Sequence, residues 1–290
     1  MKLSVLIPTY NCDCSRLVYQ LLRQLPSDGE LIVGDDCSTD SLVIHSIELA
    51  ASQPRCRLLR PAHNLGRAAI RNALASEAKG EWLLFVDADA EVRSVTFITD
   101  YLKTAEAGTA VVCGGTGNLP QCPRPAAQLR YGYETAAEKR LTLERRRSHP
   151  YAQFTTFNFL IRRQLLLDIR FDERLQQYGH EDTLFGLELE RRGISVLHID
   201  NKLTHLGLED APEYLAKTET ALRTLAEADA TLQSRVRVSA LALRLGRWRL
   251  LPFVRTVFRL SAPLLRANLL GSHPRQSLFA FYKLGYYSLH

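Results

Sequence analysis

The chain has little that would place it across a membrane or in an oxidising compartment. None of its 290 residues lies in a run of 18 consecutive apolar residues, so no membrane-spanning helix is expected. The apolar stretch between Lys2 and Pro8 covers about five residues, which is too short for a secretory signal. The six cysteines are scattered without any C-x₂-C pair, which favours reduced thiols over a metal cluster.

Two common nucleotide-binding signatures are also missing. The sequence contains neither G-x-G-x-x-G nor G-x-x-x-x-G-K-[ST]. A dinucleotide-binding fold of the usual kind and a P-loop are therefore not indicated.

Acidic residues are absent from the last part of the chain. From residue 230 onward there is no Asp or Glu, against ten Lys and Arg. The formal net charge of +6 therefore belongs to this stretch, because the rest of the chain carries a small excess of acid. Such an asymmetry predicts an anionic surface as partner.

What the first 115 residues do contain is a regular alternation of apolar and amphipathic segments. Strands are expected near 3–7, 30–34, 57–60 and 82–86, with helices near 15–25 and 41–51 and around 70–74. Alternation at these spacings predicts an α/β fold, in which a mostly parallel sheet has helices on both faces. The length fits one large domain or one domain with an appendage.

Two of the expected strands end in carboxylates. Asp87 and Asp89 follow the apolar run 82–86, and Asp35 and Asp36 follow the strand at 30–34. Open α/β sheets bind ligands at the carboxyl ends of their strands. A hard divalent ion such as Mg²⁺ or Mn²⁺ prefers oxygen ligands of this kind. The alternative is that Asp87 and Asp89 only cap the next turn or helix.

The second half offers further charged candidates, each with a purely structural alternative. The charged stretch 134–147 is either a solvated helix face or a set of arginines that meets phosphate. Glu181 and Asp182 open an expected helix, where acidic side chains also occur simply to pair with the helix dipole. His205 follows a strand expected at 194–199, and a lone histidine is often structural.

Five short motifs occur in a fixed order along the chain. They are SVLIPTYN at 4–11, GDDCSTD at 34–40, NLG at 64–66 with RN at 71–72, DAD at 87–89 and GHED at 179–182. Each motif alone is weak, but together they resemble the family 2 glycosyltransferases. The resemblance covers about residues 1–210 and implies the GT-A nucleotide-diphospho-sugar transferase fold, with a Rossmann-like sheet.

The resemblance implies contacts with a nucleotide-sugar donor. Asp36 would hydrogen-bond the base, typically the N–H of uracil, and Arg71 would lie near the nucleotide. Asp35 also matches a position of the family motif. The loop along the nucleotide would consist of Pro8, Thr9, Tyr10 and Asn11.

The resemblance also implies a metal and a general base. Asp89 would hold a divalent ion, Mn²⁺ or Mg²⁺, and Asp87 would contact the ribose or that ion. His205 would be a further metal ligand, and Asp182 would be the base. One base and one metal-held leaving group imply direct displacement with inversion, because the acceptor hydroxyl loses its proton as it attacks.

Two positions depart from the family pattern. Gly34 and Cys37 stand where valine and glycine are commoner. Because cysteine adopts a positive φ less easily than glycine, a different turn is expected at residue 37.

The C-terminal region predicts a basic amphipathic helix from Pro252. Its apolar face would hold Phe253, Val257, Leu260 and Leu264, widened by Leu251, Val254 and Phe258, with Arg255, Arg259 and Arg266 opposite. Interfacial aromatics would be Trp248, Phe279, Phe281, Tyr282, Tyr286 and Tyr287. This favours an anionic membrane surface as partner. The alternatives are packing on the catalytic domain or a homo-oligomer, and nucleic acid, for which binding motifs are lacking.

The sequence thus predicts a metal-dependent hexosyltransferase with three parts. Residues 1–115 would form the nucleotide-binding half and 116–210 the acceptor half of a catalytic domain (1–210), followed by a helical region (211–290). The enzyme would sit on the cytoplasmic face of the inner membrane. It would use a UDP-sugar and a glycan or lipid-linked acceptor in envelope polysaccharide synthesis, without nucleic acid as partner. The rivals are a non-catalytic nucleotide-sugar-binding scaffold and a nucleotidyltransferase, which would need a basic residue in the 8–11 loop.

Overall fold

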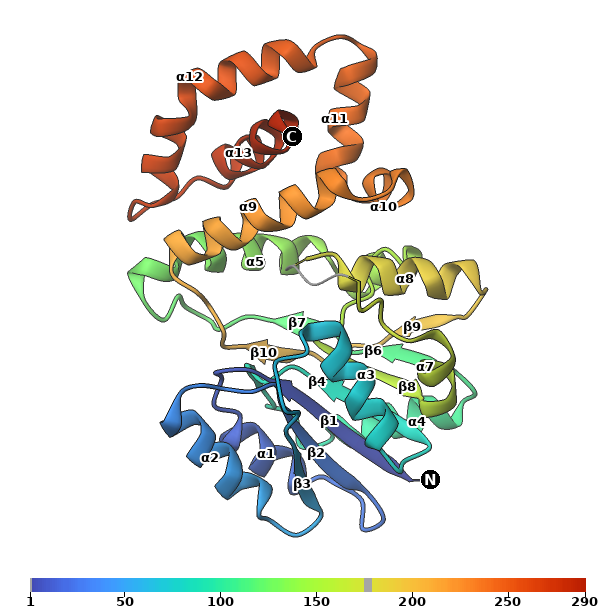
Figure 1. Cartoon of the computed structure of the whole chain (residues 1–290). Coiled ribbons are helices and arrows are strands. Elements are labelled where there is room, and N and C mark those ends of the chain that lie inside the picture. The colour runs from blue at the N-terminus through green and yellow to red at the C-terminus, as the bar shows by residue number, and fades with distance from the viewer. Residues whose placement is uncertain (1, 175–178) are drawn as a thin grey trace. The chain divides into compact units, whose positions relative to one another are not determined.

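The computed structural model describes residues 2–174 and 179–290 (Figure 1). The chain forms two compact units that are discontinuous in sequence. The first comprises Met1–Gly117, Leu141–Gln176 and Leu184–Gly207, and the second comprises Asn118–Arg140, Gln177–Thr183 and Leu208–His290. The division into nucleotide-binding, acceptor and C-terminal parts stays a prediction.

The first unit is built on a seven-stranded sheet with the order β3-β2-β1-β4-β8-β6-β9. Its strands are β1 Leu3–Thr9, β2 Glu30–Asp35, β3 Cys56–Leu59, β4 Trp82–Val86, β6 Val111–Cys113, β8 Asn158–Arg162 and β9 Val196–His198. β1 pairs in parallel with β2 and β4, whereas β8 runs antiparallel to β4 and β6. The mostly parallel sheet is confirmed, with one reversed strand that the sequence did not indicate.

Helices cover both faces of this sheet. Val5 and Ile7 pack with residues of α1 (Ser15–Leu22), α2 (Ser41–Ala51) and α4 (Phe97–Glu106). Leu6, between them, packs with residues of α3 (Arg67–Glu77), α7 (Arg163–Ile169) and α8 (Glu181–Arg191). Successive strand residues point to opposite faces, so each strand contributes to both apolar clusters. The predicted α/β fold class is confirmed.

A second, three-stranded sheet in the first unit has the order β5-β10-β7. It consists of β5 Ala90–Glu91, β7 Thr116–Gly117 and β10 Leu203–His205. β10 runs antiparallel to β5 and pairs His205 with Ala90. This pairing brings residue 205 next to the turn that carries Asp87 and Asp89.

The charged stretch 134–147 is not simply a solvated helix face, because one of its arginines is buried. It is divided between the end of α5 (Gln128–Arg140) and α6 (Leu143–Ser148). Arg146 of α6 is buried, and its guanidinium donates to the carbonyl oxygens of Gly114 at 3.2 Å and Ile199 at 3.0 Å. Burial lowers the pKa of Arg146. Arg146 therefore ties α6 to the ends of β6 and β9.

The second unit is helical. Its elements are the 3₁₀ turn η1 Pro125–Ala127, then α5, α9 Ala211–Glu227, α10 Ala230–Arg235, α11 Arg237–Arg247, α12 Leu251–Leu269 and α13 Gln276–Leu289. This confirms the helical C-terminal appendage. Its core joins α5, α9, α12 and α13 and includes Phe258, Phe279 and Tyr282. Phe279, Tyr282 and Tyr287 are buried, so the prediction that they are interfacial is wrong for these three.

Candidate active site

The first site residues follow three neighbouring parallel strands of the first unit. β1 lies between β2 and β4 and is parallel to both, so the segments after Thr9, Asp35 and Val86 leave the sheet at one edge. Ligands of open α/β sheets bind at this edge. The fold therefore brings together the loops that the sequence singled out.

The loop after β1 is fixed to the loop after β2. Pro8 and Thr9 end the strand, and Asn11 has a positive φ of 49°. The Asn11 side-chain oxygen accepts from the backbone N–H of Thr39 at 2.7 Å, and the Asn11 N–H donates to Ser38 at 2.8 Å. Tyr10 is exposed at the tip. Asn11 therefore joins the two loops.

Asp35 is fully buried at the end of β2. Its Oδ2 accepts from Nε of Arg60 at 2.9 Å, and its Oδ1 accepts from the backbone N–H of Ser38 at 3.0 Å. The hydrogen bond to Glu48, with that to Asp35, raises the pKa of Arg60. In this structure Asp35 organises the loop, and its predicted contact with a nucleotide stays a prediction.

Cys37 does adopt the conformation that glycine adopts most readily. Its φ is 63°, and its thiol donates to the carbonyl oxygen of Pro61 at 3.1 Å. The turn is also closed by a bond from the Cys37 N–H to the Asp35 carbonyl at 2.8 Å. The expected avoidance of positive φ at this position is therefore wrong, because these contacts hold the strained residue in place.

Asp36 holds the next loop. Its carboxylate oxygens accept from the backbone N–H groups of Leu65 at 2.7 Å and Gly66 at 2.9 Å. The Asn64 amide donates to the Asp36 carbonyl at 2.7 Å. The NLG motif is thus the partner of the acidic motif. A carboxylate has about four lone-pair sites, so Asp36 retains acceptor capacity for a base.

Arg71 and Asp87 form an ion pair at this edge. Arg71 projects from α3, and its Nη2 lies 2.7 Å from Oδ1 of Asp87. The Arg71 side chain is buried, while that of Asp87 is 30% exposed. The Nε atom of Arg71 has no hydrogen-bond partner among the described residues. Arg71 therefore positions Asp87, and its Nε–H remains available as a hydrogen-bond donor to a ligand.

Asp89 lies against His205. The Nε2 atom of His205 is 3.0 Å from Oδ2 of Asp89, and the imidazole is almost fully buried against Phe157. The Leu206 N–H donates to the Asp89 carbonyl at 2.8 Å. A Cβ atom on Gly207 would overlap the Asp89 carboxylate. Only glycine lets the chain after β10 pass this close.

The donor set suits a divalent ion that arrives with a phosphate ligand. In the described part of the chain, no three His, Cys, Asp or Glu side chains are grouped to hold an ion by themselves. Mg²⁺ commonly binds through one or two carboxylates plus substrate phosphates. Asp89, with His205 and Asp87 nearby, fits this pattern.

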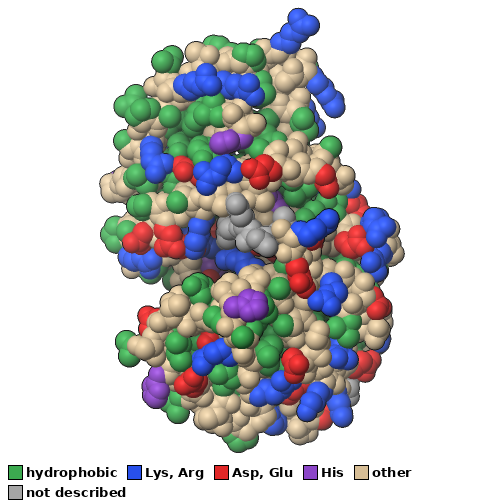
Figure 2. All heavy atoms as spheres, in the orientation of Figure 1, with side chains coloured by type: hydrophobic (Ala, Val, Ile, Leu, Met, Phe, Trp, Pro, Cys, Tyr) green, Lys and Arg blue, Asp and Glu red, His purple; other side chains and the backbone are tan. Residues whose placement is uncertain are grey.

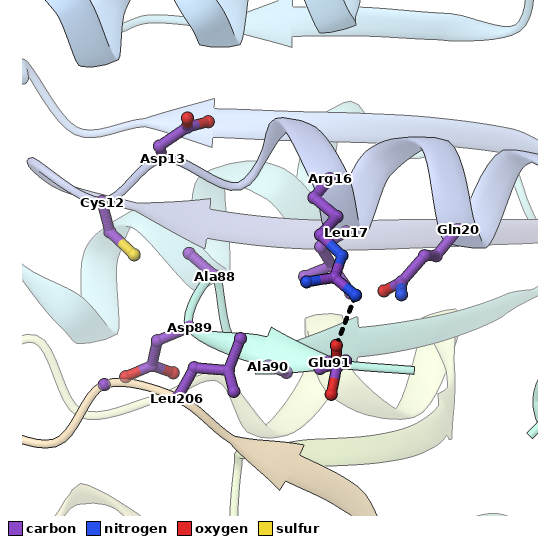
Figure 3. A pocket seen from close by; sticks show the side chains of 11 residues that line it. Cys12, Asp13, Arg16, Leu17, Gln20, Ala88, Asp89, Ala90, Glu91 and Leu206 are labelled. Atoms are coloured by element: carbon purple, nitrogen blue, oxygen red, sulfur yellow. Dashed lines mark ion pairs between the residues drawn. The ribbon is translucent and has the colours of Figure 1, made fainter. Parts of the chain in front are cut away.

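A pocket of about 170 Å³ opens beside Asp89 (Figure 3). Cys12 and Asp89 line one end, and Glu91 lies at the other, where it pairs with Arg16 at 2.7 Å. Burial, with nearby Asp89 and Asp13, raises the pKa of Cys12 to about 11. The thiol therefore stays protonated at neutral pH and is no nucleophile there.

Asp182 lies in the first turn of α8, in the segment that groups with the second unit. Before it, His180 has a φ of 72° and its ring nitrogen lies 3.1 Å from the Ala221 carbonyl oxygen. Burial lowers the pKa of His180. The contact of the His180 ring with α9 thus holds the GHED motif in place. The role of Asp182 as the base stays a prediction.

Sequence reasoning missed two residues of this site. Arg60, which neutralises Asp35, follows β3, and Gly207 follows β10. Arg60 could have been found from the sequence, because it follows β3, the strand next to β2. Gly207 could not be found, because the pairing of β10 with β5 links segments more than a hundred residues apart.

Comparisons with known proteins point to one family. A family model described as glycosyl transferase family 2 matches residues 4–170. A relative in Haemophilus influenzae, named an uncharacterized glycosyltransferase, is 38% identical over 89 residues, which are 30% of this chain and 29% of that protein. The Escherichia coli glucosyltransferase WfgD, which uses UDP-Glc and α-D-GlcNAc-diphosphoundecaprenol by its name, is 32% identical over 88 residues (30% and 34%). The chain thus spans about a third or less of these relatives.

Solved structures show the same fold over almost the whole chain. Staphylococcus aureus TarS 1–349 with UDP-GlcNAc has a TM-score of 0.55 at 20% identity, and the match covers 99% of this chain and 90% of that one. The Pyrobaculum calidifontis mannosyltransferase PcManGT with GDP-Man and Mn²⁺ has a TM-score of 0.57 at 14% identity, covering 99% and 84%.

Proposed function

The chain belongs to glycosyl transferase family 2 and has the GT-A fold, and we propose that it transfers a hexosyl group from a UDP-sugar to a glycan or lipid-linked glycan, with inversion. The observation that supports this most is the one sheet edge at which Asp36 follows β2 and Asp87 and Asp89 follow β4, with Arg71 paired to Asp87 and His205 to Asp89.

The donor nucleotide would lie over the loops after β1 and β2. Asp36 is held by two backbone N–H groups and would accept the uracil N–H with a remaining lone pair. Tyr10 is 51% exposed and presents a ring for stacking on the base. Pro8, Thr9 and Asn11 fix this loop, and the uncommitted Nε of Arg71 would donate to the nucleotide.

A divalent ion would be held by Asp89 and His205, with Asp87 shared between ribose and ion. Such an ion stabilises the charge that develops on the diphosphate leaving group. The chain's own contribution is to fix the carboxylate: His205 and the close passage of Gly207 leave Asp89 little freedom. A preorganised site of this kind costs no reorganisation during the reaction.

Asp182 would take the proton of the acceptor hydroxyl. A helix N-terminus favours a negative charge, so the first turn of α8 suits a carboxylate base. A base that acts on the acceptor while the donor leaves implies a single displacement, and hence inversion.

The relatives support an acceptor in the synthesis of envelope polysaccharide. WfgD is named for a diphosphoundecaprenol acceptor, and TarS is named for poly(ribitol-phosphate). In the described residues no helix is both long and apolar enough to cross a membrane. Peripheral attachment at the cytoplasmic face, through the basic C-terminal region, would bring the enzyme to a lipid-linked acceptor.

A nucleotide-sugar panel tests the donor assignment. A UDP-sugar at 100 times its Kd should stabilise the fold by about 2.7 kcal/mol, and Mn²⁺ should be required. UDP release then reports turnover, and Asp36→Asn should weaken binding without removing the metal requirement. Binding without any turnover would favour the scaffold. Stabilisation by nucleoside triphosphates in place of nucleotide sugars would favour the nucleotidyltransferase.

A further inference from the structure

Helix α12 carries two apolar faces, and only one of them is covered. Phe258, Leu265 and Leu269 are buried in the core of the second unit. Phe253, Leu260 and Leu264 are 70%, 79% and 76% exposed. Their spacing of seven and eleven residues returns to the same side of a helix, so they form a stripe on the outer side of α12.

Two more exposed apolar side chains lie just before α12, where α11 passes into it. Trp248 there is 73% exposed and Leu250 is 44% exposed. Arg247 and Arg249 flank Trp248 and are exposed as well. Tryptophan with neighbouring arginines is typical of a surface that lies at a membrane interface.

The charge of this region has one sign. Residues 230–290 hold ten Lys and Arg and no Asp or Glu. Figure 2 shows hydrophobic and basic side chains over α11 and α12, with basic side chains projecting at the corner between them. Arg259 on α12 is exposed as well and lies about 100° around the helix from Leu260, on the flank of the stripe and not opposite it as expected.

We propose that this surface binds an anionic phospholipid bilayer. We call it the α12 outer surface and define it by Trp248, Leu250, Phe253, Leu260 and Leu264 with Arg247, Arg249 and Arg259. The apolar side chains would enter the headgroup boundary, and the arginines would pair with lipid phosphates. A second copy fits less well, because it would set arginines against arginines.

This proposal specifies the membrane contact of the proposed function, but it does not depend on sugar transfer. The α12 outer surface contains none of the residues assigned to donor, metal or base. Vesicle binding and release of UDP from a soluble donor can therefore fail independently of one another.

The test is flotation of the full chain with vesicles of phosphatidylcholine and phosphatidylglycerol in a three-to-one ratio, against phosphatidylcholine alone. We expect binding to the anionic vesicles only. Of the two tryptophans, Trp82 is buried in β4, so a blue shift of the emission on binding reports Trp248. Equal binding to both vesicle types, or no binding to either, would overturn the proposal.

Two variants separate the apolar and basic contributions. The triple variants W248S/F253S/L260S and R247Q/R249Q/R259Q should each lower the partition onto anionic vesicles about tenfold or more. The matched control L42S/V95S changes two residues of the first unit that are 78% and 87% exposed, and it should bind as the unaltered chain does. Unchanged binding by both triple variants overturns the proposal. A dimer in light scattering that the first variant dissociates would assign the surface to a second copy instead.

Discussion

The two units differ in the balance of their charged side chains. At the sheet edge of the first unit each acidic residue has a partner from the same unit: Asp35 has Arg60, Asp87 has Arg71, and Asp89 has His205. In the second unit, residues 230–290 contain ten basic residues and no acid of their own, and Arg266 of this stretch pairs with Glu219 of α9 at 2.6 Å. Paired charges give fixed geometry, which suits a small ligand, whereas an excess of charge of one sign suits an extended anionic surface.

The largest effect is expected from removing the metal ligand. Asp89→Ala should lower metal-dependent transfer by about a thousandfold, because the leaving-group charge would lose its stabilisation. UDP release at saturating Mn²⁺ measures this. The matched control is Asp13→Ala, a carboxylate of the same pocket that accepts from the Ser15 N–H, which should retain activity. Equal losses of activity in both variants would contradict the assignment of Asp89 as a metal ligand, because any carboxylate of the pocket would then matter equally.

The second largest effect is expected from removing the proposed base, Asp182, which lies in the segment grouped with the second unit. Asp182→Asn should lower transfer by about 10² to 10⁴-fold while leaving the Kd for the UDP-sugar unchanged. Glu181→Gln, in the same helical turn, is the control and should be close to unaltered. If Glu181→Gln loses activity and Asp182→Asn does not, the base has been assigned to the wrong carboxylate.

A smaller effect tests how tightly the first unit fixes its geometry. Gly207→Ala would push the Asp89 carboxylate aside, so turnover should fall by about a hundredfold with little change in Tm. Gly246→Ala in α11 is the control, because its added Cβ meets nothing within 4 Å. Normal turnover of Gly207→Ala would show that Asp89 does not need its present position.

The smallest effect is on stability against pH. Burial, with Arg146 nearby, lowers the pKa of His198, whose Nε2 lies 2.9 Å from the Pro150 carbonyl oxygen. A folded pKa below the unfolded value gives stability that is present above about pH 6.5 and is lost as the pH falls. Thermal unfolding between pH 7.5 and 5 should show this fall, and His198→Gln should flatten it. An equally steep fall in the variant would assign the effect to other groups.

Much of the first unit could be predicted from local patterns. The apolar runs before Asp35 and Asp87 became β2 and β4, and the parallel order placed their carboxyl ends at one edge. The reversed strand β8 and the pairing of β10 with β5 could not be predicted, because pairing partners are chosen by packing between distant segments. For the same reason Arg146 was indistinguishable from its exposed neighbour Arg145 until its burial was seen.

The C-terminal region shows where a pattern of residues is insufficient. The periodicity of α12 correctly indicated an amphipathic helix, but it merged Phe258 with Phe253 and Leu260 on one apolar side. In the structure Phe258 packs against α13 and the other two face outward. A helical wheel gives the angle of each side chain, but the neighbouring helix decides which part of a wide apolar side is covered.

The sequence alone determined the α/β class, the family resemblance and the acidic strand ends, because these depend on local periodicity and on short motifs. Tertiary structure alone decided which carboxylates are held by arginine, histidine or backbone N–H groups, and which face of α12 remains outside. These outcomes depend on contacts between segments far apart in the chain, and a local sequence pattern does not encode the free energy of such contacts.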